Sequence, residues 1–172
     1  MPALRETTSD IWAIKTTSQL EKPRYIILGF QKVENSDSRE KDATLFTDAG
    51  IRDIRLYLNS EVYPYEHWNL DFGKKLIVPA YYTYECFQNT YYDREFNEPL
   101  MDVGEFLKNP VFVIDCSNQP EGIKSSTIDI KLEFEENQKF EKNTRVYALI
   151  LHDAYLTYNA LDGSVRLGDK HF

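Results

Sequence analysis

The sequence contains few cysteines and no concentration of positive charge, and each shortage excludes a class of protein. Its 172 residues carry a net charge of −8, and no cluster of lysine and arginine interrupts this acidic balance. Nucleic-acid-binding faces and surfaces that bind anionic membranes need such clusters, so we expect neither partner. The only two cysteines, Cys86 and Cys116, each lie in an apolar segment. We interpret them as buried free thiols in a reducing compartment.

The amino-terminal sequence MPALRETTSD lacks the apolar core of a secretory signal, so we do not expect a secreted protein. These first ten residues are polar, and we expect residues 1–10 to be flexible. Hydrophobic residues make up 42% of the chain, which is enough to form a core and makes global disorder unexpected. The length fits one domain that spans residues 1–172.

Motifs that would carry enzyme chemistry are also missing. The sequence contains no glycine-rich phosphate loop, no HExxH, no GxSxG and no cysteine pair at zinc spacing. The histidines are too far apart in the sequence to predict a metal cluster: His67, His152 and His171. The neighbouring His152 and Asp153 could act as an acid–base pair, but their position at a strand end favours a structural role. We therefore predict no enzyme activity, no catalytic residue, no cofactor and no metal site.

The segment Arg24–Val33 is the one around which we expect the chain to fold. Its continuous apolar run, Tyr25–Leu28, is too short to span a membrane and too rich in β-branched and aromatic residues to favour a helix. Such a run is typical of a strand that is covered on both faces. Gly29 is predicted to let another backbone or a bulky side chain approach closely.

Two further segments alternate between apolar and polar residues, as half-buried strands do. In Ile51–Asn59, one set of side chains is predicted to point inward (Ile54, Leu56 and Leu58) and the other outward (Asp53, Arg55 and Tyr57). Thr127–Glu136 has the clearest pattern. Its apolar residues are predicted to be buried (Ile128, Ile130, Leu132 and Phe134) and its charged residues exposed (Asp129, Lys131, Glu133 and Glu135).

Turns, shorter strands and helices are predicted between these segments. Five more strands are expected: Ile11–Thr17, Pro110–Cys116, Thr144–His152, Tyr155–Asn159 and Ser164–Leu167. Asn59–Tyr65 is predicted to be a turn in which Pro64 limits pairing. Asp153–Ala154 is expected to connect two strands tightly, and Asp162–Gly163 indicates a hairpin. Apolar residues at helical spacing after Pro79 predict a helix over Ala80–Tyr92, and Asp102–Lys108 is expected to be a helical turn.

This arrangement of about eight strands, without alternating helices, indicates an antiparallel sandwich. We predict an all-β fold: a single eight-stranded antiparallel jelly-roll sandwich with one or two short inserted helices. Eight strands in two facing sheets is the jelly-roll count, although the strand pattern by itself leaves other sandwiches open.

The predicted helix is unusually rich in tyrosine. Tyr81, Tyr82 and Tyr92 fall partly outside its apolar stripe and are our candidate interface residues. Aromatic side chains can stack on sugar rings, but they are also enriched at helix–sheet contacts and in protein interfaces. We favour packing or a protein interface over glycan binding.

Several segments, taken in order, resemble a known family. KPRYIILGFQ, LNSEVYPYEHWNLDF, PVFVIDCS, the alternating strand and ALILHDAYLTYNALDGSVR look like the carboxyl-terminal portion of double jelly-roll-like proteins. These are the major capsid proteins of polinton-like and adintovirus-like elements. The resemblance extends from about Trp12 to Arg166 and involves structural segments, so it implies no catalytic residues.

The resemblance implies an eight-stranded jelly roll. In such capsid proteins two jelly rolls stand side by side, and three copies form a pseudo-hexagonal capsomer. This chain is long enough for only one, so we expect the amino-terminal half to be missing.

We hypothesise a structural, non-enzymatic, major-capsid-like protein, viral or domesticated from a viral or transposon element, found in a virion or in the cytoplasm or nucleus. Its partners would be copies of itself, in a trimer or hexamer, or other capsid-like jelly rolls. The alternative is a host-adapted binding module that uses its loops or the tyrosine-rich helix to bind a protein or glycan.

Overall fold

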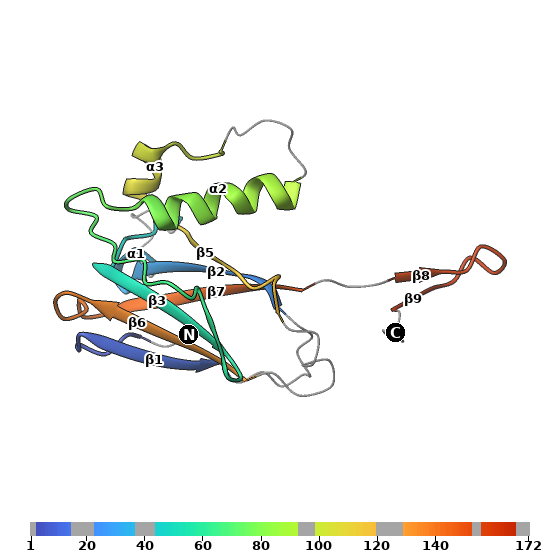
Figure 1. The fold of residues 1–172 in the computed structure, drawn as a ribbon, viewed down its shortest axis with the longest axis horizontal. Coiled ribbons are helices and arrows are strands. Elements are labelled where there is room, and N and C mark those ends of the chain that lie inside the picture. The colour runs from blue at the N-terminus through green and yellow to red at the C-terminus, as the bar shows by residue number, and fades with distance from the viewer. Residues whose placement is uncertain are drawn as a thin grey trace.

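Two antiparallel sheets face each other, and a helical layer covers the outer face of the smaller one (Figure 1). The computed structural model describes residues 3–14, 23–36, 44–92, 99–119, 129–152 and 156–167. The larger sheet has the order β1 (Ser9–Ile14), β6 (Ile130–Glu136), β3 (Ile51–Leu58), β4 (Glu61–Tyr63). The smaller sheet has the order β5 (Phe112–Asp115), β2 (Pro23–Lys32), β7 (Thr144–His152). A separate hairpin consists of β8 (Leu156–Tyr158) and β9 (Val165–Leu167). The helices in the described residues are α1 (Val33–Ser36), α2 (Val78–Tyr92) and α3 (Val103–Lys108).

The predicted fold class, an all-β antiparallel jelly-roll-like sandwich with inserted helices, is confirmed. The strand count differs slightly. The described residues form nine strands, because Glu61–Tyr63 is the strand β4 and pairs with β3. We predicted only a turn there, and Pro64 does follow the strand directly, but it leaves the three residues before it free to pair.

Strand β2 is covered on both faces, as its apolar run predicts. It lies between β5 and β7, with Ile26, Leu28 and Phe30 completely buried. The Phe30 ring meets the Phe134 ring of the opposite sheet edge-on, at 5.4 Å between centroids. On the outer face, the Tyr25 ring packs edge-on against Phe87 of α2 at 4.9 Å. The strand therefore joins all three layers of the fold.

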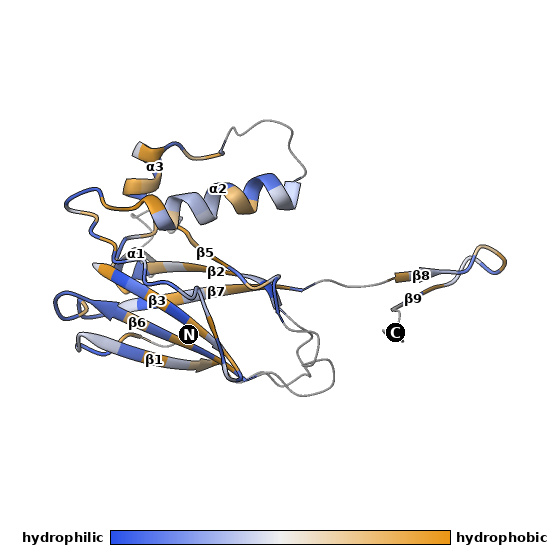
Figure 2. Cartoon of the chain, viewed as in Figure 1, coloured by the Kyte–Doolittle hydropathy of each residue, from blue (hydrophilic) through white to orange (hydrophobic). Residues whose placement is uncertain are grey.

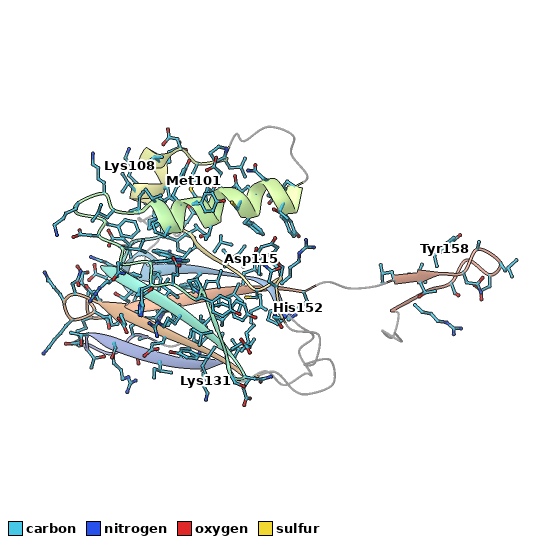
Figure 3. The ribbon with its side chains drawn as sticks, viewed as in Figure 1. Met101, Lys108, Asp115, Lys131, His152 and Tyr158 are labelled. Atoms are coloured by element: carbon cyan, nitrogen blue, oxygen red, sulfur yellow. The ribbon has the colours of Figure 1, made fainter. Side chains whose placement is uncertain are left out.

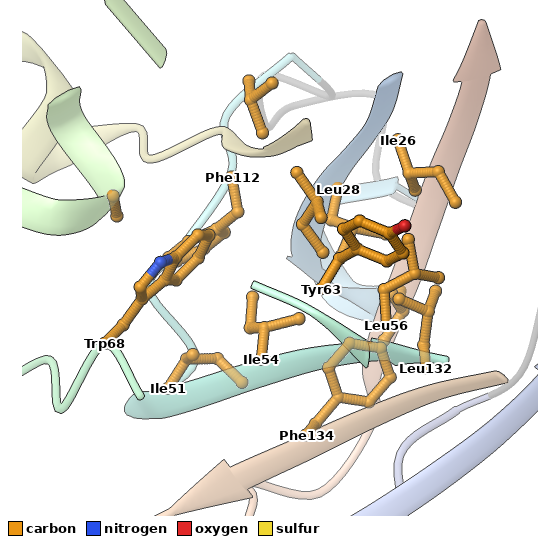
Figure 4. Packing of buried hydrophobic residues seen from close by; sticks show 14 of the residues in the cluster. Ile26, Leu28, Ile51, Ile54, Leu56, Tyr63, Trp68, Phe112, Leu132 and Phe134 are labelled. Carbon is orange, nitrogen blue, oxygen red and sulfur yellow. The ribbon is translucent and has the colours of Figure 1, made fainter. Parts of the chain in front are cut away.

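The alternation in β6 is confirmed for its apolar residues and for Lys131. Ile130, Leu132 and Phe134 are buried and Lys131 is exposed (Figure 4 shows Leu132 and Phe134 in the core). Thr127 and Ile128 of this predicted strand lie outside the described residues.

Two predicted exposures in β6 differ, since Glu133 and Glu135 are half-buried. The strand lies between β1 and β3, whose side chains flank its outer face. The Tyr57 hydroxyl on β3 donates a hydrogen bond of 2.7 Å to the Glu133 carboxylate.

Strand β3 contains one error of prediction. Ile54, Leu56 and Leu58 point inward as expected, but Asp53 is buried as well, with 2% of its surface exposed. The register with β6 shifts between Ile51 and Asp53, which disturbs the alternation. The Asp53 carboxylate accepts the backbone N–H of Trp68 at 3.2 Å and contacts His67, so the following segment covers it.

The flexibility of residues 1–10 stays a prediction, but the described residues 3–10 make tertiary contacts. Leu4 is 5% exposed, and its N–H donates to the carbonyl of Thr144 at 2.8 Å. Asp10, on β1, receives the Arg5 backbone N–H and the Arg5 guanidinium. Burial favours the neutral carboxyl, but these hydrogen bonds outweigh it and lower the pKa of Asp10. The segment is held by tertiary contacts that its polar composition does not reveal.

The two longer helices, α2 and α3, were predicted from the sequence, whereas the four-residue helix α1 was not. Helix α2 begins two residues before the expected Ala80 and buries Ala80, Tyr84, Phe87 and Gln88. Helix α3 has a capping box, in which the Asp102 carboxylate accepts the N–H of Glu105 and the Glu105 side chain accepts the N–H of Asp102.

Both cysteines are free, as predicted, but their exposure differs. Cys116 has no exposed surface, and burial, with a smaller contribution from Asp115, raises the pKa of its thiol to about 12. Cys86 is half-buried on α2. Since the thiolate is the reactive form, we expect maleimide to label only Cys86 in the native protein. In a Cys86→Ser variant, labelling should require unfolding. Equal native reaction rates for the two thiols would contradict this packing.

Candidate assembly surfaces

The helical layer exposes a group of large apolar side chains, which we call the helix surface. It consists of Leu76, Val78, Tyr82, Tyr91, Tyr92, Leu100 and Val103. Their exposed fractions range from 49% to 74%. Figure 2 shows apolar residues at the start of α2 and on α3. Exposed apolar area of this kind on one layer of a domain commonly marks an interaction site.

The structure separates the three candidate interface tyrosines. The Tyr81 hydroxyl donates to the carbonyl of Met101 at 3.2 Å, and its ring meets Phe106 of α3 at 5.3 Å. Tyr81 is half-buried, and these two contacts connect α2 with α3 and the residue before it. Tyr82 is 62% exposed and Tyr92 is 51% exposed. Ten residues of helix place these two about 15 Å apart along the axis and about 80° apart around it, so one small contact cannot include both.

The hairpin β8–β9 is the second apolar surface, and the exposure of its apolar side chains was not predicted from the sequence. Tyr158 pairs with Val165, and Leu156 lies two residues before Tyr158 on the same strand, so these three residues share one face, while Thr157 and Arg166 lie on the other. Leu156, Tyr158 and Val165 are more than 60% exposed, and Leu161 at the tip is 98% exposed. The hairpin turn at Asp162–Gly163 was predicted correctly, and Gly163 has φ +70° there. The predicted connection Asp153–Ala154 lies outside the described residues.

A cavity of about 310 Å³ lies at the end of the sandwich, where carboxylates of Asp48, Asp71 and Glu136 gather. The Glu136 side chain lies over Gly50, where a Cβ would come within 2.0 Å of its Oε1 atom. Burial, followed by the neighbouring Glu141 and Asp48 carboxylates, raises the pKa of Glu136. Within the described ranges, no three or more His, Cys, Asp or Glu side chains are placed to hold a metal ion.

The raised pKa of Glu136 leads to a prediction about the pH dependence of stability. A folded pKa above its ordinary value of 4.5 means that the native state binds this proton more tightly than the unfolded chain does. The contribution of Glu136 to stability is therefore greatest at acidic pH and declines as pH rises from 4.5 through the folded pKa. We expect Glu136→Gln to raise the melting temperature at neutral pH and to weaken this decline. Glu135→Gln is the control on the same strand, and equal changes in both variants would contradict the assignment.

The two histidines that the structure describes, His67 and His152, have separate surroundings. The His67 imidazole contacts the Asp53 carboxylate, and its Nδ1 lies 2.9 Å from the Arg55 guanidinium. These contacts join the segment after β4 to β3, which is a structural task. His152 ends β7. Its predicted partner Asp153, like His171, lies outside the described residues, so the pair stays a prediction.

Comparison with known proteins identifies the family to which this chain belongs. The family model of the double jelly roll-like domain matches residues 1–156. The chain belongs to this family. The match confirms the resemblance seen in the sequence, and it ends at the first residue of β8. The double jelly roll-like domain is a capsid-type structural fold and is not a known enzyme family.

No curated protein and no solved structure matches this double jelly roll-like chain. In the part of the chain that the structure describes, no helix is long and apolar enough to cross a membrane.

Proposed function

We propose that this protein is a non-enzymatic building block of a capsid-like shell, which associates with copies of itself through the sides of its sandwich. A closed trimer or hexamer is the expected assembly, in a virion or within the cell. The observation that carries this proposal is the helix surface, a set of exposed apolar side chains on the flank of a double jelly roll-like sandwich. Capsid-type jelly rolls pack side by side, so we expect a neighbouring copy to bury an exposed apolar flank of this kind.

The composition of the helix surface supports a specific contact. Val78 and Tyr82 lie four residues apart on the same face of α2 and are 74% and 62% exposed, and tyrosine is enriched in the cores of protein interfaces. The net charge of −8 opposes non-specific aggregation, yet an apolar flank can still form a closed contact between copies.

The mass of the protein in solution tests the proposal. Light scattering across a wide range of concentration should give the mass of a trimer or hexamer. A single-chain mass at every concentration would overturn the proposal and leave the alternative, a binding module for a protein or glycan.

A substitution on the flank tests where the contact lies. We expect Tyr82→Arg to weaken self-association at least tenfold, because it places a charge in an apolar contact. Gln138→Arg adds the same charge to an exposed turn at the end of the sandwich, away from the flank, and should leave association unchanged. If both variants weaken association equally, the flank is not the contact.

A further inference from the structure

The two facing sheets are unequal, and the difference leaves a gap beside β7. In the described part of the chain the larger sheet has four strands and the smaller has three, with β7 at an edge of the smaller sheet. Strand β1 lies at an edge of the larger sheet, and residues just before it reach across to β7: Ala3 forms a bridge with Arg145. The two edges therefore lie on the same side of the sandwich.

Among the described residues, the edge of β7 is occupied only at its beginning. The N–H of Leu4 donates to the carbonyl of Thr144, so the carbonyl of Thr144 points toward the edge. Backbone groups alternate in direction along a strand, and those of Ala148 and Ile150 therefore point the same way. No described strand pairs with this stretch on that side. Such an open row of N–H and C=O groups is a template for an added strand.

The apolar interior is also incompletely covered at this place. Trp12 and Ile14 of β1, and Ala148 and Ile150 of β7, pack against the core but are only half-buried. At the other end of the same strands, where Leu4 covers the core, Val146 is completely buried. The half-buried residues mark the position of a missing neighbour for β7, opposite β1.

The hairpin β8–β9 has the properties that this neighbour requires. Its apolar face exposes Leu156, Tyr158 and Val165, and the outer edges of its strands are unpaired among the described residues. A two-stranded hairpin with an uncovered apolar face is only marginally stable by itself. In Figure 1 the hairpin lies beyond the end of β7 and apart from its own sandwich, and Figure 3 shows Tyr158 far from His152 at the end of β7.

We propose that the β8–β9 hairpin of one copy docks along the open edge of β7 in a second copy. There it adds strands to the smaller sheet, and its apolar face covers the gap beside Trp12 and Ile150. The hairpin and the edge are different surfaces, so each copy offers one of each to its neighbours, and the contacts can close into a ring. This inference rests on the proposed function and adds a second contact between copies, which the closed assembly requires together with the helix surface.

Two kinds of variant separate the two halves of the contact. Leu156→Glu/Tyr158→Glu places charges on the apolar face of the hairpin, and Thr157→Glu/Arg166→Glu is the control on its opposite face. Ala148→Pro removes the outward N–H of the β7 edge, a position at which an edge strand tolerates proline. Ile150→Lys is a second edge variant, because an inward-pointing charge also blocks strand addition. Native protection of Cys116 from maleimide reports whether each variant is folded.

Light scattering on the full chain measures the mass of the wild type, of each variant and of their mixtures. We expect the wild type and the opposite-face control to be oligomeric, whereas the hairpin variant and the edge variants are single chains. Mixing the hairpin variant with an edge variant should give a one-to-one complex, since one partner supplies an intact hairpin and the other an intact edge. A mixture that stays monomeric would mean that the hairpin acts within its own chain and would overturn the inference. An oligomeric hairpin variant would overturn it too, but would leave the proposed self-association in place. A monomeric wild type would overturn both.

Discussion

Truncating Phe134 to alanine should lower the free energy of unfolding by about 3–5 kcal/mol, the usual cost of removing a buried phenylalanine side chain. Phe134 has no exposed surface, lies opposite Ile54 on β3 and meets the Phe30 ring of the other sheet. Neither sheet can close the resulting cavity without losing its strand pairing. The loss is therefore a large fraction of the stability of about 5–15 kcal/mol that is typical of a domain.

Lys131→Ala is the matched control, because Lys131 is exposed on the same strand. It should change the free energy of unfolding by less than about 0.5 kcal/mol. Glu133 would be a poorer control, since it accepts the Tyr57 hydroxyl. Denaturant melts that give similar losses for Phe134→Ala and Lys131→Ala would show that the register of β6 is wrong.

Gly29→Ala should lower the free energy of unfolding by about 1–3 kcal/mol, as overpacking a core does. A Cβ at this position would lie 2.6 Å from Cε1 and 2.7 Å from Cδ1 of the Phe46 ring. The ring covers the outer face of β2, and the strand cannot retreat because both of its edges are paired. The ring must therefore move out of its contact.

A double-mutant cycle isolates this clash from other effects of the substitution. In a Phe46→Ala background, Gly29→Ala should cost little, because nothing then occupies the space. Gly73→Ala is a control in an exposed segment, where the nearest atom to the added Cβ is Asp71 Oδ1 at 3.3 Å. An equal cost of Gly29→Ala with and without the Phe46 ring would contradict the close packing described for β2.

The elements that were predicted well depend on local patterns. The run at Tyr25–Leu28 indicated a strand covered on both faces, and β2 is such a strand. Pro79 and the spacing of Ala80, Tyr84 and Phe87 located α2 to within two residues. In each case the signal lies within a few residues of the element that it forms.

The elements that were missed depend on contacts between distant segments. The burial of Asp53 results from a register shift against β6 and from the N–H of Trp68. The tertiary contacts of residues 3–10 involve Thr144 and the pairing of Arg5 with Asp10. Strand β4 is three residues long, and its partner β3 is what makes it a strand. No local period indicates any of these.

The outcome for the candidate surfaces is similar: local patterns located some of their residues, and contacts between distant segments determined the rest. Sequence composition pointed to the tyrosine-rich helix, and two of the three tyrosines chosen there, Tyr82 and Tyr92, are more than half exposed. Tyr81 instead packs on Phe106, because α3 folds back over it. Strands were predicted near β8 and β9, but their separation from the sandwich was not, since a strand pattern does not state which sheet the strand joins.

Electron cryomicroscopy of the protein in solution would test the central claim most directly. The account predicts a closed ring of three or six sandwiches that stand side by side, with their flanks in contact and their end loops free. The helix surface or the β7 edge should then lie within the contacts. Particles the size of one chain, or sandwiches joined end to end through their loops, would contradict the claim that this double jelly roll-like protein is a capsid-like building block.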